Sequence, residues 1–152
     1  MPLDVTAAVR IEAPPAAVAA VQFDPTRDPD WIGGVDRVEL LTPPPLALQS
    51  QVRRLGAFLG RRIEWVMRVD ELEKDRHVGM HALRSPFPMD VDYLLEPLDG
   101  GHATQATIRI RGNAKGMYGL PGPFLGPMVR RSVSGDLRRL KRIVEGGGGQ
   151  RW

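Results

Sequence analysis

The sequence predicts an α+β fold, in which a curved antiparallel sheet of about seven strands surrounds a long C-terminal helix. Residues 5–13 alternate between apolar and polar side chains, and so do several segments between residues 35 and 112. Short turns join these segments, which favours antiparallel pairing with one buried face. From residue 125 onward, apolar residues recur every three or four positions, as in a helix with one buried side.

The first alternating segment, VTAAVRIEA, predicts a half-buried strand that ends at Pro14 and Pro15. Proline suits the first turn of a helix, and the following AAVAAVQFD has the apolar residues of a short one. The repeated Asp-Pro of DPTRDPDW predicts turns and one more helical turn, which ends near Trp31. Two short helices are therefore expected between the first strand and Gly33-Gly34.

Turn-forming residues divide the next part of the chain into about six strands. These breaks are Pro43–Pro45, Gly56 with Gly60, Ser85–Pro88 and Asp99–Gly101. The predicted strands are VDRVELL, LALQSQVRRL, RRIEWVMRVDEL, RHVGMHALR, MDVDYLLEPL and HATQATIRIRG.

The C-terminal helix has a single apolar stripe, made of Leu125, Val129, Val133, Leu137, Leu140 and Val144. Three prolines precede or enter it in GLPGPFLGPM, so a regular helix is expected only from about Pro127 onward. Residues 116–127 then have two interpretations, a deformable gate at a cavity mouth or a bent lead-in that caps the core. Residues 1–145 are expected to form one domain, followed by a glycine-rich flexible tail at 146–152.

Composition narrows the classes of protein. The chain has 152 residues, of which 42% are hydrophobic and 26% charged, as in an ordinary globular domain. It has no cysteine, which excludes disulfides and thiol nucleophiles. There is no run of eighteen apolar residues and no recognisable signal peptide, so we expect no transmembrane segment and a cytoplasmic location.

The net charge of +3 is small, and the paired basic residues do not form a basic stripe with aromatic residues interspersed. Nucleic acid is therefore not an expected partner. The paired basic residues have two interpretations. They are ordinary solvent-exposed charges, or those around Arg138, Arg139 and Arg142 form a basic surface that docks on a protein or a membrane.

One helix is too narrow to cover the inner face of this sheet. A helix is about 10 Å wide, whereas seven strands about 4.8 Å apart extend over roughly 30 Å. We expect the sheet to curl around the helix and to leave an apolar cavity between them.

The chain resembles the START-like (SRPBCC) superfamily of polyketide cyclases and lipid-transport proteins. The resemblance extends over residues 5–145 and rests on APPAAVAAV, PDWIGGVDRVEL, YLLEPLDGGHATQATIRI and GPFLGPMVRRSVSGDLRRLKRIVE in that order. It implies a helix-grip fold and a cavity for a hydrophobic small molecule such as a lipid or polyketide. It does not identify the ligand, because this scaffold serves binding, transport and catalysis.

Inward-facing strand positions give most of the candidate ligand contacts, which are Trp65, Met67, Met80, Val91, Tyr93, Leu95, Ile108 and Ile110. The resemblance adds Trp31 as a wall of the closed end, although it could instead anchor the short helices. The gate interpretation adds Leu120, Phe124 and Met128. Tyr93 and Trp65 carry polar tips that could orient a ligand, although ordinary core packing is the alternative for each.

Few titratable groups are expected at the cavity. Arg54 is the one charged residue that the alternation of its strand places on the inner face of the sheet. His77 and His81 would share a face of one strand, but no third ligand is recognisable, so neither a metal nor a cofactor is expected.

Three functions remain open. The leading hypothesis is a protein that binds, and could carry, a small hydrophobic molecule. The second is a polyketide cyclase or dehydratase, with Tyr93, Arg54 and His81 as its candidate catalytic residues. The third is the basic adaptor; the oligomeric state stays open for all of them.

Overall fold

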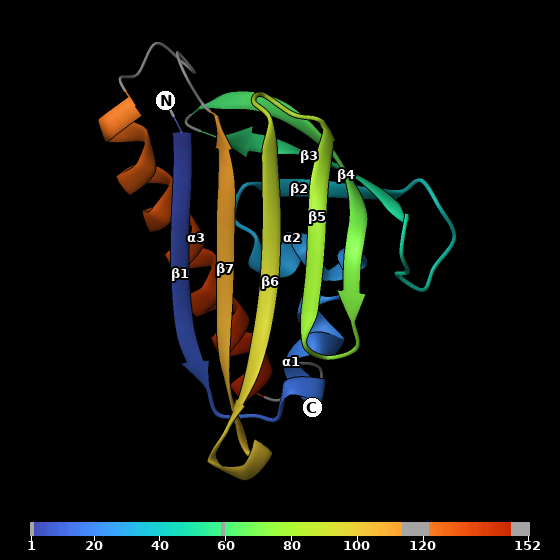
Figure 1. Ribbon diagram of the computed structural model, residues 1–152, viewed down its shortest axis with the longest axis vertical. Helices are drawn as coiled ribbons and strands as arrows, with labels where there is room; N and C mark the ends of the chain where they lie inside the picture. The colour runs from blue at the N-terminus through green and yellow to red at the C-terminus, as the bar shows by residue number, and fades with distance from the viewer. Residues whose placement is uncertain (1, 59, 114–121, 147–152) are drawn as a thin grey trace.

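The computed structural model describes residues 2–58, 60–113 and 122–146, and it confirms the predicted α+β helix-grip fold. Seven strands form one antiparallel sheet in the order β1-β7-β6-β5-β4-β3-β2 (Figure 1). The strands are β1 Pro2–Ile11, β2 Val35–Leu40, β3 Gln51–Phe58, β4 Arg61–Glu73, β5 His77–Arg84, β6 Met89–Leu98 and β7 Ala103–Asn113. The helical elements are α1 Pro15–Gln22, η1 Pro25–Arg27, α2 Asp28–Trp31, η2 Asp99–Gly101 and α3 Gly122–Glu145.

Strands β2 to β7 pair with their neighbours in sequence, whereas β1 pairs with the distant β7. Val5 of β1 lies opposite Ile110 of β7. Tyr93 of β6 lies opposite Ile108 of β7, so both side chains are on the inner face of the sheet. The alternation read from the sequence therefore assigns the two faces correctly at the centre of the sheet.

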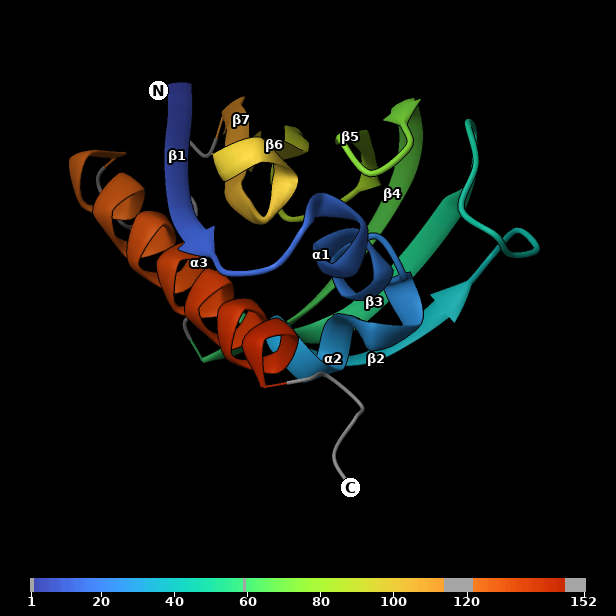
Figure 2. The same ribbon diagram turned by 90° about the horizontal axis from the view of Figure 1, so that it is seen from below.

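The sheet curls around the helices, as the narrow width of a single helix predicted (Figure 2). Helix α3 packs mainly along β1 and covers that edge of the sheet. The opposite edge is β2, a strand of six residues with a register shift between Val35 and Arg37. Its exposed Asp36 and Arg37 discourage pairing with another chain.

Helix α3 begins at Gly122, earlier than the sequence predicted, and Pro127 lies inside it. Pro123 falls in the first turn, where no N–H is needed as a donor. Pro127 has no backbone N–H, so the helix lacks one of its internal hydrogen bonds there. Packing of the apolar stripe against the core stabilises the helix in spite of this loss. That stripe is confirmed by Leu125, Val129, Val133, Leu137 and Leu140, all of which are buried.

Strand β3 begins at Gln51, and Gly56 lies within it instead of ending it. A Cβ atom at Gly56 would stand 1.7 Å from the carbonyl oxygen of Gly34. That same oxygen accepts a hydrogen bond from the N–H of Ala57 at 2.8 Å. The glycine is therefore required by the close approach of two backbones, not by a turn.

Among the described residues, no helix is both long enough and apolar enough to cross a membrane. The part of the predicted tail from Gly147 onward lies outside the described residues.

Candidate functional site

A cavity of about 160 Å³ lies between helix α3 and the inner face of the sheet. It exists because α3 packs along β1 and α1 packs near β6 and β7, which leaves part of the central strands without a helix above them. Its wall is formed by Trp31, Ile32, Gly34, Val35, Arg54, Ala57, Ile63, Trp65, Met67, Met80, Pro86, Phe87, Met89, Val91, Tyr93, Ile108, Ile110, Val129, Ser132, Val133 and Asp136.

Most of the residues that the sequence predicted for the cavity wall are found there. They are Trp31, Trp65, Met67, Met80, Val91, Tyr93, Ile108 and Ile110. Leu95 is buried in the core but does not line the cavity, and Met128 is 38% exposed. Leu120 and the side chain of Phe124 lie outside the described residues, as do residues 116–121 of the predicted gate.

Sequence reasoning missed the part of the wall that comes from outside the alternating strands. Phe87 lies in the break between β5 and β6, where no periodicity identifies an inward position. Ser132 and Asp136 come from α3, beside its apolar stripe. Ser132 is exposed as well as lining the cavity, so the cavity reaches the surface beside it.

Arg54 brings a charged group to the cavity wall and forms a buried ion pair with Asp28, which does not itself line the cavity. Nε of Arg54 on β3 donates to Oδ2 of Asp28 on α2, and both residues are buried. The alternation along β3 predicts that Arg54 points inward, but nothing in the short α2 segment identifies Asp28 as its partner. Burial raises the pKa of the Asp28 carboxyl, against the opposing attraction of the Arg54 charge.

Several buried polar atoms, one of them on Asp28, lack a hydrogen-bond partner within the described part of the chain. They are Oδ1 of Asp28, Nε1 of Trp31 and the amide nitrogen and oxygen of Gln22. Buried polar groups are normally hydrogen-bonded, so such atoms call for ordered water or a polar group of a ligand. Trp31 lines the cavity, so its indole N–H is the donor among them best placed for a ligand.

Tyr93 stands on the central strand β6 and is also buried. The edge of its ring meets Trp31 with centroids 5.7 Å apart, and its face stacks on Phe23 at 6.4 Å. Burial raises the pKa of the Tyr93 phenol well above its usual range, although the charge of Arg54 acts in the opposite direction. The hydroxyl is therefore neutral at physiological pH and can donate a hydrogen bond, but it cannot act as a phenolate base.

Asp136 brings a second acidic group to the cavity wall. Its Oδ1 accepts a hydrogen bond of 3.0 Å from the N–H of Gly33 and another from Arg139. Arg139 in turn donates from Nε to the carbonyl oxygen of Trp31 at 3.0 Å. Burial raises the pKa of Asp136, against these two hydrogen-bonding partners. The result is a carboxyl group whose proton is held more tightly than in water.

His81 does not belong to this site, which corrects its place among the catalytic candidates. Its Nδ1 lies 2.8 Å from Oδ1 of Asp90, on the outer face of the sheet. The sheet itself separates it from Tyr93, so His81 cannot exchange a proton with a molecule in the cavity.

Comparison with known proteins agrees with this architecture. Residues 2–145 match the family described as "Polyketide cyclase / dehydrase and lipid transport". No curated protein matches the chain.

Three solved structures illustrate the likeness of the fold. TTHA0849 from Thermus thermophilus is 16% identical, with a TM-score of 0.80 over 96% of this chain and 99% of that one. A START superfamily protein from Mycobacterium smegmatis is 17% identical, with a TM-score of 0.80 over 94% and 97% of the two chains. The Zhui aromatase/cyclase of a Streptomyces species is 23% identical, with a TM-score of 0.78 over 98% and 99%.

Proposed function

Since this chain belongs to the polyketide cyclase / dehydrase and lipid transport family, we propose that it binds a small hydrophobic molecule in the cavity beside α3. The observation that carries the proposal is a mostly apolar cavity whose wall includes the polar groups of Arg54 and Tyr93, with Asp28 bound to Arg54 behind that wall. Residues 1–145 would act as one ligand-binding domain in the cytoplasm, with no nucleic-acid partner.

The dimensions of the cavity support a ligand with a small apolar body. An apolar cavity of about 150 Å³ is large enough to hold benzene and stays free of water, and this one measures about 160 Å³. Burial of apolar surface would stabilise the complex by about 25 cal/mol per Å². A longer ligand would extend past Ser132, where the cavity reaches the surface.

The polar groups of the wall support a ligand that carries oxygen. Arg54 uses Nε for Asp28, and within the described part of the chain its NH1 is seen to contact the sulfur of Met80 at 4.0 Å. A carbonyl, hydroxyl or carboxylate oxygen of a ligand would accept a stronger hydrogen bond from this guanidinium. The Tyr93 hydroxyl and the Trp31 indole are further donors on the same wall.

Two measurements test the binding function. Native mass spectrometry of freshly purified protein is expected to show a co-purified molecule or a complex formed with an added lipid or polyketide.

Binding of 1-anilinonaphthalene-8-sulfonate to the cavity should be lost in Val91→Phe, which places a ring in the cavity. Leu94→Phe is the matched control, because Leu94 is on the same strand but is 39% exposed. Equal binding by both variants would contradict the cavity as the site.

A second candidate function is cyclisation or dehydration of a polyketide-like chain in the same cavity. The observation that favours it is the presence of Arg54, Tyr93 and Asp136 among the residues that line one cavity. The carboxylate of Asp136 could take a proton from the carbon next to a ketone, while Arg54 and Tyr93 hold the enolate oxygen. The cavity would also hold a flexible chain in a folded shape and so lower its entropic barrier.

The basic adaptor receives less support. Arg138 and Arg142 are exposed on α3, but Arg139 is bound to Trp31 and Asp136. Salt-sensitive association that disappears in Arg138→Ala/Arg142→Ala, with or without ligand, would favour the adaptor over the binding protein.

A further inference from the structure

Three metal-ligating side chains meet on the outer face of the sheet, on the side opposite the cavity. Glu71 comes from β4, His77 from β5 and Asp92 from β6. Nε2 of His77 lies 2.7 Å from Oδ1 of Asp92 and 3.9 Å from Oε1 of Glu71. One donor atom from each residue lies within 4.8 Å of the others.

A glycine lies between the two carboxylates and lets both side chains pack close to its backbone. Gly79 of β5 is the register partner of Glu71 on one side and of Asp92 on the other. A Cβ atom at Gly79 would stand 3.1 Å from Oε1 of Glu71 and 3.1 Å from Oδ1 of Asp92. Any other residue would thus put its side chain between these two oxygens. His77, two positions earlier on the same strand, projects from the same face.

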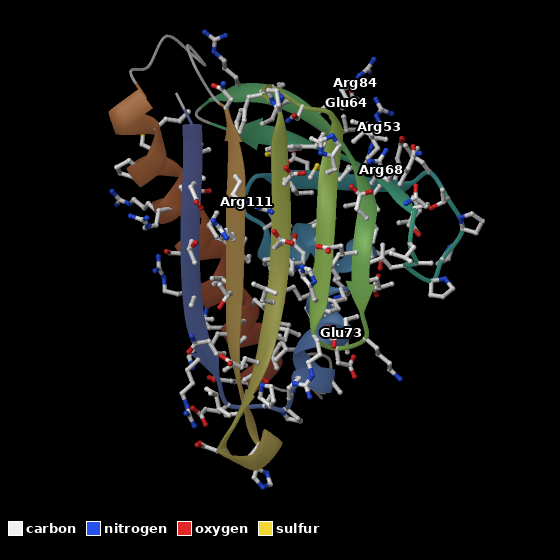
Figure 3. The ribbon with its side chains drawn as sticks, viewed as in Figure 1. Arg53, Glu64, Arg68, Glu73, Arg84 and Arg111 are labelled. Atoms are coloured by element: carbon white, nitrogen blue, oxygen red, sulfur yellow. The ribbon has the colours of Figure 1, made fainter. Side chains whose placement is uncertain are left out.

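Arg111 of β7 holds the Asp92 carboxylate from the other side. Its NH2 donates to Oδ2 of Asp92 at 3.1 Å, which leaves Oδ1 directed toward His77. Figure 3 shows Arg111 on the face of the sheet that is turned to the viewer. A hydrogen bond to the second oxygen of a ligating carboxylate is a common way to fix its orientation.

We propose that Glu71, His77 and Asp92 bind one divalent transition-metal ion of the Zn²⁺ type. One imidazole nitrogen and two carboxylate oxygens are ligands that Zn²⁺ accepts, at about 2.0–2.2 Å, with water completing a tetrahedral site. Ligand atoms at these bond lengths from a tetrahedral ion lie roughly 3.4 Å apart, so Glu71 must move closer to His77 and the hydrogen-bonded atoms of His77 and Asp92 must separate. The Glu71 side chain is 68% exposed and can therefore move. On binding, Nε2 of His77 exchanges its hydrogen bond with Asp92 for a bond to the metal.

A neighbouring pair on the same strand lacks this arrangement. His81 lies 2.8 Å from Asp90, but the described residues place no third ligand atom within the same reach. The two histidines therefore differ in the number of ligands around them. This makes His81 an internal control for His77.

Titration of the full chain with ZnCl₂ by isothermal calorimetry tests the proposal. One Zn²⁺ per chain is expected, and His77→Gln and Asp92→Asn should each weaken binding by about tenfold or more, whereas His81→Gln should leave it unchanged. Circular dichroism confirms that each variant is folded. Absence of Zn²⁺ binding by the wild-type protein would overturn the proposal. So would wild-type affinity in His77→Gln, or an equal loss in His81→Gln.

Discussion

Arg54 and Asp28, 26 residues apart in the sequence, form an ion pair in the interior of the protein, where their residues are 7% and 0% exposed. The pair joins β3 to the short helix α2, and its Arg54 lines the cavity. It therefore holds a charged group in place at a mostly apolar cavity wall.

Removal of both partners of this pair should cost less stability than the two single removals added together. Arg54→Met leaves the Asp28 carboxylate buried without its counter-ion, which is expected to lower the free energy of unfolding by about 3–5 kcal/mol. The double variant Arg54→Met/Asp28→Asn should lose less than the sum of the two single variants. Urea denaturation at pH 7 measures all four proteins, and additive losses would contradict an energetic coupling of the pair.

Tyr93→Phe should alter ligand preference while leaving the fold intact. The hydroxyl forms no hydrogen bond that the described residues show, so its loss should change stability by less than about 1 kcal/mol. Affinity for a ketone or alcohol should fall about two- to tenfold, and affinity for the matching hydrocarbon should not change. Competition with a fluorescent apolar probe measures both.

The Tyr93→Phe variant also distinguishes a ligand carrier from an enzyme. A Tyr93→Phe protein that binds a polyketide normally but loses all conversion of it would overturn the carrier function. It would favour the cyclase or dehydratase instead.

Gly56→Ala should be strongly destabilising. The new methyl group would meet the carbonyl oxygen of Gly34 at 1.7 Å, and a backbone atom cannot move aside as a flexible side chain can. We expect a loss of at least about 2–3 kcal/mol in the free energy of unfolding. Thermal unfolding followed by circular dichroism measures it, and wild-type stability would show that β2 and β3 can separate at little cost.

Gly135→Ala should have the opposite effect. A Cβ atom there would find NH2 of Arg138 at 3.7 Å and NH1 of Arg139 at 3.9 Å, both ordinary contacts with movable side-chain ends. Alanine in the middle of a helix is favoured over glycine by about 0.5–1 kcal/mol. A rise in stability of that size by urea denaturation is expected, and a decrease would reveal a packing role for the glycine.

Asp136 should make stability depend on pH in a direction unlike that of most carboxylates. Its pKa is raised in the folded protein by burial, so the folded state favours the protonated carboxyl. The favourable contribution is present at pH values below the unfolded pKa, near 3.8, and is lost as pH rises through the folded pKa. Relative to Asp136→Asn, the wild-type protein should therefore lose stability as pH increases across this window. A stability difference that is constant between pH 3 and 8 would contradict the raised pKa.

Much of the fold can be predicted because the relevant signals are local. Alternation along β6 and β7 assigns Tyr93 and Ile108 to the inner face, and the spacing of Leu125 and Val129 gives the buried side of α3. The predicted helix start is wrong because Pro127 can be accommodated at the loss of a single hydrogen bond. Gly56 resembles a strand end because a close approach of two backbones has no signature in a single segment.

The site is less predictable because its polar part is assembled from distant segments. Arg54 can be identified from its phase, but its partner Asp28 lies in a helix of four residues, which is too short for a periodic pattern. Asp136 lies outside the apolar stripe of α3, so in the sequence it looks like an ordinary solvent-exposed acidic residue of an amphipathic helix. The proposed metal ligands Glu71 and Asp92 flank Gly79 only after three strands have paired.

The pairing of β1 with β7 has a consequence for biosynthesis. Val5 and its partner Ile110 are separated by about a hundred residues of chain, so the first strand waits on the order of 5–20 s for its partner to be translated. During that interval its apolar residues Val5 and Ile11, buried in the finished protein, have no sheet to join. Nascent chains arrested before residue 103 should therefore be cut by protease within β1, and chains released after α3 should resist.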